Sequence, residues 1–113
     1  MKKKKVTAGR VYLGEFAPKF AELNDDVLFG QVWSREEQLS PRDRSLITVS
    51  ALMAMSIMDQ SLKSHLIKSK ENGIKNDEIV EVITHLAFYT GWPKAWAAFS
   101  MAKKVFGADV KQT

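Results

Sequence analysis

Hydrophobic residues recur along the chain with helical spacing, and the longest apolar stretch runs from Leu46 to Met55. A segment that is apolar on every side is typical of a helix buried on all sides. The residues before it form a helix start, because Ser40 is an N-cap candidate, Pro41 suits the first helical position, and Asp43 puts negative charge in the first turn. The pattern therefore predicts a buried central helix around which the other helices pack.

Shorter amphipathic patterns lie on both sides of this helix. Two short helices are expected before it, separated by a break at Asn24-Asp25-Asp26, and three after it, two of which end at Asn72-Gly73 and Thr90-Gly91. The residues expected on the inner faces of these helices are Leu13, Phe16, Phe20, Leu23 and Val27; then Met58, Leu62, Leu66 and Ser69; then Ile79, Val82, Ile83, Leu86 and Ala87; then Ala95, Trp96, Phe99, Ala102, Val105 and Phe106. Strand alternation persists nowhere, so the sequence predicts an all-α fold.

The length of 113 residues suggests one domain. We assign residues 1–10 to a disordered basic tail and residues 11–113 to a single domain. Lysines at positions 2–5 account for the net charge of +4, since the remainder has 13 basic and 13 acidic residues. A nucleic-acid-binding domain carries its basic residues on the folded surface. We therefore expect neither a nucleic acid nor a membrane as a partner.

The chain contains no cysteine, which excludes disulfides, thiolate metal sites and thiol-based redox catalysis. It has no stretch of 18 apolar residues, and its basic N-terminus is not followed by the apolar segment of a secretory signal. A cytoplasmic protein is the expectation. The segments Leu46–Met55 and Ala95–Phe106 offer more apolar surface than one small bundle can cover, which predicts a homo-oligomer. The alternative is that this surface is all monomer core.

His65 is a candidate general acid or base, because imidazole titrates near neutral pH. Ser61 precedes it by one helical turn and can hydrogen-bond to it. The alternative is a half-buried core histidine beside Leu62 and Leu66. No carboxylate stands at helical spacing to complete a triad, and no oxyanion motif is visible, so a serine hydrolase is not expected.

His85 lies four residues after Glu81 and four before Tyr89, so Glu81 can orient or charge its ring. The alternative is a surface ion pair, with Tyr89 packed in the core. His-x-x-x-His and Glu-x-x-His spacings do not occur, so no metal site is expected at His65 and His85.

Arg42 and Arg44 stand at the start of the central helix, where positive charge opposes the helix dipole. A contact with a carboxylate, on a substrate or a partner subunit, would explain them better than solvated surface charge. The aromatic residues are candidates for core, interface or pocket wall, namely Trp33, Trp92, Trp96 and Tyr89.

Together, these segments resemble the carboxymuconolactone decarboxylase family over roughly Phe16 to Phe106. The most specific parts are Ser-Pro-Arg-x-Arg from Ser40 and His-x-x-x-Tyr-x-Gly-Trp-Pro from His85, joined by Asn-Gly-Ile from Asn72. The resemblance implies an alkylhydroperoxidase D-like helical bundle of about five to six helices, assembled as a trimer or hexamer with sites near subunit contacts.

One branch of this family, the alkylhydroperoxidase D-like branch, uses a Cys-x-x-Cys-x-x-x-His site for peroxide and disulfide chemistry. Met58 and Ser61 stand where the two thiols would be, and only His65 of that motif remains. Neither Met nor Ser can form a thiolate or a disulfide, so thiol peroxidase activity is excluded.

The second branch is similar to this chain in lacking the cysteine pair. It is the decarboxylase of aromatic catabolism, which converts 4-carboxymuconolactone to an enol-lactone and CO2 without metal or organic cofactor. The resemblance therefore implies a lyase that acts on a carboxylated lactone or similar small acid. The candidate catalytic residues are His65 and His85, and the candidate substrate-binding residues are Arg44, Arg42, Ser61, Tyr89 and Trp92.

Ser61 departs from the family pattern, since decarboxylase-like sequences commonly have an acidic residue there. This departure leaves the substrate open. The alternative function is that of a family member that binds an unidentified small ligand and whose histidines are structural.

Overall fold

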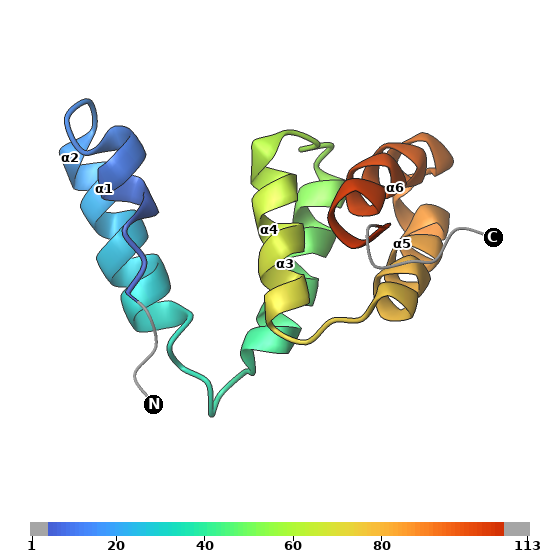
Figure 1. The fold of residues 1–113 in the computed structure, drawn as a ribbon, viewed down its shortest axis with the longest axis horizontal. Helices are drawn as coiled ribbons and strands as arrows, with labels where there is room; N and C mark the ends of the chain where they lie inside the picture. The colour runs from blue at the N-terminus through green and yellow to red at the C-terminus, as the bar shows by residue number, and fades with distance from the viewer. Residues whose placement is uncertain (1–4, 108–113) are drawn as a thin grey trace. The chain divides into compact units, whose positions relative to one another are not determined.

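The computed structural model describes residues 5–107, and its contacts divide the chain at residue 41 into an N-terminal unit, Met1–Pro41, and a C-terminal unit, Arg42–Thr113. All regular elements of the described residues are helices, which confirms the all-α prediction (Figure 1). They are α1 (Ala8–Leu13), α2 (Pro18–Glu22), the π-helix η1 (Leu23–Val32), α3 (Pro41–Ala54), α4 (Gln60–Glu71), α5 (Asn76–Thr90) and α6 (Trp92–Phe106). The assignment of residues 11–113 to one domain stays a prediction.

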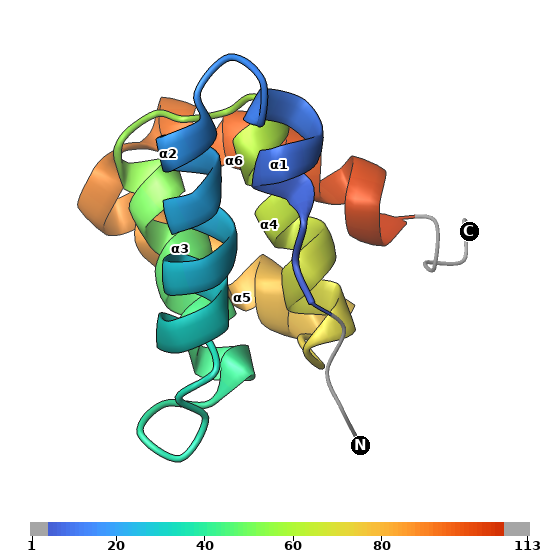
Figure 2. The same ribbon diagram turned by 90° about the vertical axis from the view of Figure 1, so that its left-hand side faces the viewer.

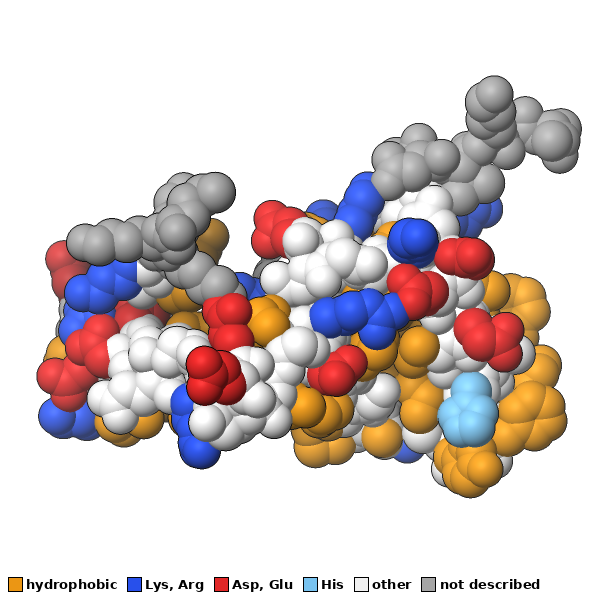
Figure 3. Space-filling view, turned by 90° about the horizontal axis from the view of Figure 1, so that it is seen from below, with side chains coloured by type: hydrophobic (Ala, Val, Ile, Leu, Met, Phe, Trp, Pro, Cys, Tyr) orange, Lys and Arg blue, Asp and Glu red, His pale blue; other side chains and the backbone are white. Residues whose placement is uncertain are grey.

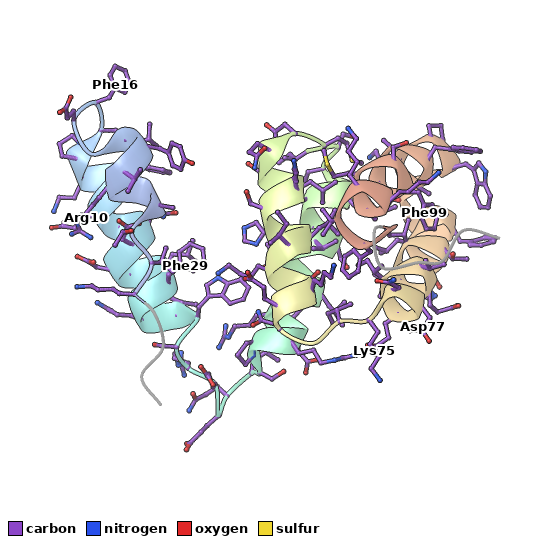
Figure 4. The ribbon with its side chains drawn as sticks, viewed as in Figure 1. Arg10, Phe16, Phe29, Lys75, Asp77 and Phe99 are labelled. Carbon is purple, nitrogen blue, oxygen red and sulfur yellow. The ribbon has the colours of Figure 1, made fainter. Side chains whose placement is uncertain are left out.

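In the N-terminal unit, α1 lies beside α2 and η1 (Figures 1 and 2). It begins at Ala8, so the predicted disordered tail is wrong for residues 8–10, while residues 1–4 of that tail lie outside the described residues. Phe16 stands at the tip of the connection from α1 to α2 (Figure 4). The unit is therefore a helical hairpin.

The second arm of this hairpin is continuous, because α2 passes directly into η1. The predicted break at Asn24-Asp25-Asp26 is therefore wrong. The hydrogen bonds of η1 span five residues, as in the 2.9 Å bond from the Trp33 N–H to the Leu28 carbonyl at its end. Asp25 does not end a helix but accepts hydrogen bonds from the first turn of another, α1.

The core of the C-terminal unit draws on all four of its helices. Only one face of α3 is buried, through Ser45, Val49 and Met53, and Ile47 is 57% exposed. The prediction of a helix buried on all sides is therefore wrong. The buried apolar residues are Val49, Met53, Leu62, Leu66, Ile74, Ile79, Ile83, Ala87, Ala95, Ala98, Ala102 and Phe106.

The amphipathic patterns of α4 and α5 are confirmed, because the predicted faces contribute Leu62, Leu66, Ile79 and Ile83 to this core. In α6 the buried face consists of Ala95, Ala98, Ala102 and Phe106. Trp96, expected in the same apolar stripe, is 69% exposed. The small alanines of α6 therefore pack in the core, and the large indole of Trp96 remains outside it.

Two lysine side chains hydrogen-bond to carbonyl groups at the ends of helices that are distant from them in sequence. The Lys94 ammonium donates to the carbonyl of Ala54 at the end of α3 at 2.8 Å, and that of Lys70 donates to the carbonyl of Val105 in the last turn of α6 at 3.3 Å. Gly91, between α5 and α6, has a φ of 109°, which an L-residue with a side chain rarely adopts.

None of the helices in residues 5–107 is long and apolar enough to cross a membrane.

Candidate functional site

His65 lies in the second turn of α4. The helix starts at an N-cap formed by Asp59, whose Oδ1 accepts a 2.9 Å hydrogen bond from the backbone N–H of Ser61. His65 is half-buried, with its Nδ1 atom shielded from solvent. Burial lowers the pKa of His65 below its ordinary 6.5, and the positive charge of Lys68 lowers it further. The imidazole is therefore neutral at neutral pH, as a proton acceptor must be.

Ser61 is exposed in the first turn of α4. Its backbone contact with Asp59 belongs to the cap of the helix. A neighbouring pair in the same turns, Gln60 and Ser64, is joined by a 3.2 Å side-chain hydrogen bond. The start of α4 thus presents a polar surface next to His65.

Arg42 and Arg44 lie in the first turn of α3, and both are partly buried. Arg42 Nη2 donates to Oε2 of Glu78 in α5, and this ion pair joins the starts of the two helices. The carboxylate contact expected for Arg42 therefore exists, but in this structure its partner is the chain's own Glu78. The carbonyl of Arg44 accepts a 2.8 Å hydrogen bond from Thr48 Oγ1.

His85 and Tyr89 form a pair on the outer surface of α5. Their ring centroids are 5.0 Å apart and the planes are tilted by 33°. His85 is exposed and Tyr89 is 77% exposed, so Tyr89 does not pack in the core. One residue before Tyr89, the Phe88 ring meets Trp92 edge-to-face at 5.8 Å. Figure 3 shows hydrophobic side chains gathered at this α5–α6 end of the C-terminal unit, with a histidine among them.

An apolar pocket of roughly 310 Å³ opens between α5 and α6. Trp92, a candidate substrate-binding residue, lines this pocket. Trp96, which the sequence analysis gave as a possible pocket wall, lines it as well. Phe99, labelled on α6 in Figure 4, was missed as a site residue, although it lies three residues after Trp96 in the same helix. The full lining consists of Thr84, Ala87, Trp92, Ala95, Trp96 and Phe99.

The candidate residues are distributed over four helices. Arg42 and Arg44 belong to the first turn of α3, Ser61 and His65 to the first two turns of α4, and His85, Tyr89 and Trp92 to α5 and α6. The apolar pocket has only Trp92 from these seven in its lining. Within residues 5–107, no three His, Cys, Asp or Glu side chains gather into a group that could hold a metal ion.

Comparison with known proteins places all the candidate residues within one family match. The model of the carboxymuconolactone decarboxylase family matches residues 18–104, which include all seven candidate residues. The chain is also 37% identical over 94 residues to a 4-carboxymuconolactone decarboxylase from Acinetobacter baylyi (strain ATCC 33305 / BD413 / ADP1). This match covers 83% of the chain and 69% of the relative.

Proposed function

The chain belongs to the carboxymuconolactone decarboxylase family, and from this premise we propose that it is a cofactor-free carboxy-lyase acting on a carboxylated lactone or similar small acid. The identity with the decarboxylase of Acinetobacter baylyi is the observation that carries this proposal. It makes 4-carboxymuconolactone the first candidate substrate. Because the chain contains no cysteine, it has no thiol peroxidase site.

The reaction sets three requirements for a site. The bond between carbon and carboxylate breaks, CO2 leaves, and the electron pair stays on the substrate, where the conjugated lactone carbonyl can accept its charge. A proton then adds to carbon. The protein must hold a carboxylate, offer an apolar wall that disfavours the charged group, and supply an acid–base group.

His65 is the proposed acid–base group. Its half-buried position and lowered pKa support this role, because a neutral imidazole can take up a proton from water, and its protonated form then gives that proton to carbon more readily than a free histidine would. His85, which lies exposed against Tyr89, is proposed as a second group that contacts the substrate.

Arg44 is the proposed carboxylate-binding residue, because the guanidinium geometry suits a carboxylate. Arg42 already contacts Glu78, so its proposed part is to support the same helix turn. Trp92 and Tyr89 would supply the apolar wall, with the pocket between α5 and α6 continuing it. Ser61 is proposed to face the substrate where the family commonly has an acidic residue.

A homo-oligomer, trimer or hexamer, forms part of this proposal. Four aromatic side chains of α5 and α6 are mostly exposed in the single chain: Phe88 and Tyr89 at 77%, Trp92 at 57% and Trp96 at 69%. Aromatic residues are enriched at subunit interfaces. A second copy that covers them would remove water from the apolar side of the site.

The test is a turnover assay with freshly generated 4-carboxymuconolactone, in which CO2 and enol-lactone are followed over time. Wild-type protein is compared with His65→Ala and with Ser64→Ala, an exposed neighbour on the same helix. We expect turnover by the wild type and by Ser64→Ala, and loss of turnover in His65→Ala. Turnover retained in His65→Ala would return His65 to a structural role. A folded wild type without turnover would refute the proposed reaction on this substrate.

The second candidate function is binding of an unidentified small ligand without catalysis. The apolar lining of the pocket favours it, because no arginine or histidine contributes to that lining. Isothermal titration of the lactone against wild type and Arg44→Ala separates the two functions. Binding that persists in Arg44→Ala and is not followed by CO2 release would support the second.

A further inference from the structure

Glu78 uses its two carboxylate oxygens for two different helices. Oε1 accepts a 3.0 Å hydrogen bond from the backbone N–H of Lys75, which closes the N-terminus of α5 as part of a capping box. Oε2 accepts from Arg42 Nη2 in the first turn of α3. Figure 4 labels Lys75 and Asp77 at this start of α5. One partly buried carboxylate therefore ties the start of α3 to the start of α5.

A second contact anchors the same turn of α3. Ser45 is fully buried, and its Oγ accepts a 2.9 Å hydrogen bond from Asn72 Nδ2 at the end of α4. In the sequence, Arg44 lies between Arg42 and Ser45, the two residues that make these contacts. Its own carbonyl is held by Thr48. The backbone that carries the Arg44 side chain is thus fixed from several directions.

We infer that Glu78 is a positioning residue for Arg44, because through Arg42 it holds the turn of α3 from which Arg44 reaches the substrate carboxylate. This inference rests on the proposed function. Two arginines at a helix N-terminus repel each other and oppose the helix dipole. The negative charge of Glu78 offsets that repulsion.

The test is a double-mutant cycle on steady-state kinetics with 4-carboxymuconolactone. Glu78→Gln removes the charge, but its amide oxygen can still accept the hydrogen bond from Lys75 and so keep the cap of α5. Arg42→Gln removes the other partner, and the double variant removes both. Asp77→Asn is the matched control, because it deletes an exposed carboxylate one residue away in the same helix turn.

We expect Glu78→Gln to raise KM about threefold to fivefold, as for the loss of one partly exposed ion pair, with kcat changed less than about twofold. Asp77→Asn should leave both constants near those of the wild type. In the Arg42→Gln background, Glu78→Gln should have no further effect on KM, because its partner is already gone. Arg42→Lys, which keeps the charge, should recover part of the affinity.

Three results would overturn the inference. One is an unchanged KM in Glu78→Gln, and another is effects of the two single variants that multiply independently. The third is a fall in kcat that follows a loss of helical circular dichroism, which would make Glu78 only structural. Absence of turnover in the folded wild type is a different failure, since it refutes the proposed function and removes this inference with it.

Discussion

The backbone N–H of Gly9 donates a 2.8 Å hydrogen bond to Oδ1 of Asp25, sixteen residues later in the chain. The other oxygen of Asp25 accepts from the backbone N–H of Arg10 at 3.0 Å, so a carboxylate that is 1% exposed caps the first turn of α1. Burial by itself raises the pKa of Asp25, but hydrogen bonds from Asn24, Arg10 and Gly9 and the Arg10 charge outweigh it and hold the pKa below 3.8. A helix as short as α1 depends on such contacts.

We predict that Asp25→Ala detaches the first turn of α1. Without the carboxylate, the N–H groups of Gly9 and Arg10 lose their acceptor, and their amide exchange should accelerate about tenfold or more. Hydrogen exchange followed by NMR measures this. Asp26→Asn, which removes an exposed partner of Arg10, should change the same amides much less. Equal acceleration in both variants would contradict the assignment of Asp25 as the cap.

Gly9→Ala should destabilise the N-terminal unit, although alanine is normally the better helix former. A Cβ at Gly9 would lie 2.7 Å from Oδ1 of Asp25 and 2.8 Å from the carbonyl oxygen of Ala21, closer than real contacts allow. Thermal unfolding followed by circular dichroism should show a lower midpoint. Gly30→Ala is the comparison, because its nearest contact, the Asp25 carbonyl oxygen, is 3.3 Å away and the expected loss is smaller.

His65 should make stability depend on pH. Its lowered pKa means that the unfolded chain binds more protons than the folded chain between pH 6.5 and the lowered pKa. The free energy of unfolding should therefore fall as the pH drops below 6.5, and level off below the lowered pKa. Urea unfolding at several pH values should show this fall in the wild type and a smaller one in His65→Gln. Lys68→Gln should weaken it, because it removes one cause of the shift.

Phe88→Glu should reduce the assembled mass of the protein. A charge in the middle of an apolar interface is left without water or a partner, which weakens association. Light scattering coupled to size-exclusion chromatography measures the mass, with Ser64→Glu on the exposed surface of α4 as the control. A wild type that is already monomeric, or an unchanged mass in Phe88→Glu, would contradict an interface at the aromatic side chains of α5 and α6.

The helices that were predicted well are those with one apolar and one polar face. In α5, Ile79, Ile83 and Ala87 are buried at a spacing of four residues, as the pattern predicted. In α3 the apolar residues surround the helix, so no polar positions distinguish the buried side from the side of Ile47. Which side of α3 is buried depends on how the other helices pack against it, and the sequence periodicity of α3 does not show this.

The N-terminal unit was predicted less well because its key contact is distant in sequence. Asp25 beside Asn24 and Asp26 is typical of a turn, but the side chain caps α1 from within η1. A π-helix repeats its contacts at five residues, a spacing that a search for α-helical periodicity does not test.

The roles of the candidate site residues stay predictions, but the contact expected for Arg42 can be compared with the structure. A carboxylate was expected beside Arg42, and Glu78 supplies one within the chain. The sequence alone does not distinguish a carboxylate thirty-six residues away in the same chain from the carboxylate of a substrate, because either one can pair with Arg42. Phe99 gave no signal of its own, because an aromatic residue in an apolar helix stripe is usually core.

The lysine contact at the end of α3 has a consequence for the order in which the chain folds. Lys94 belongs to α6 and is forty residues after Ala54, whose carbonyl it binds. Local contacts within α3 can form early, but this one must wait until α6 has been made and has packed. During synthesis on the ribosome, the last turn of α3 therefore lacks this contact until α6 emerges. A chain cut after Thr90 would lose α6 and, with it, the closing contact of a helix that ends thirty-six residues earlier.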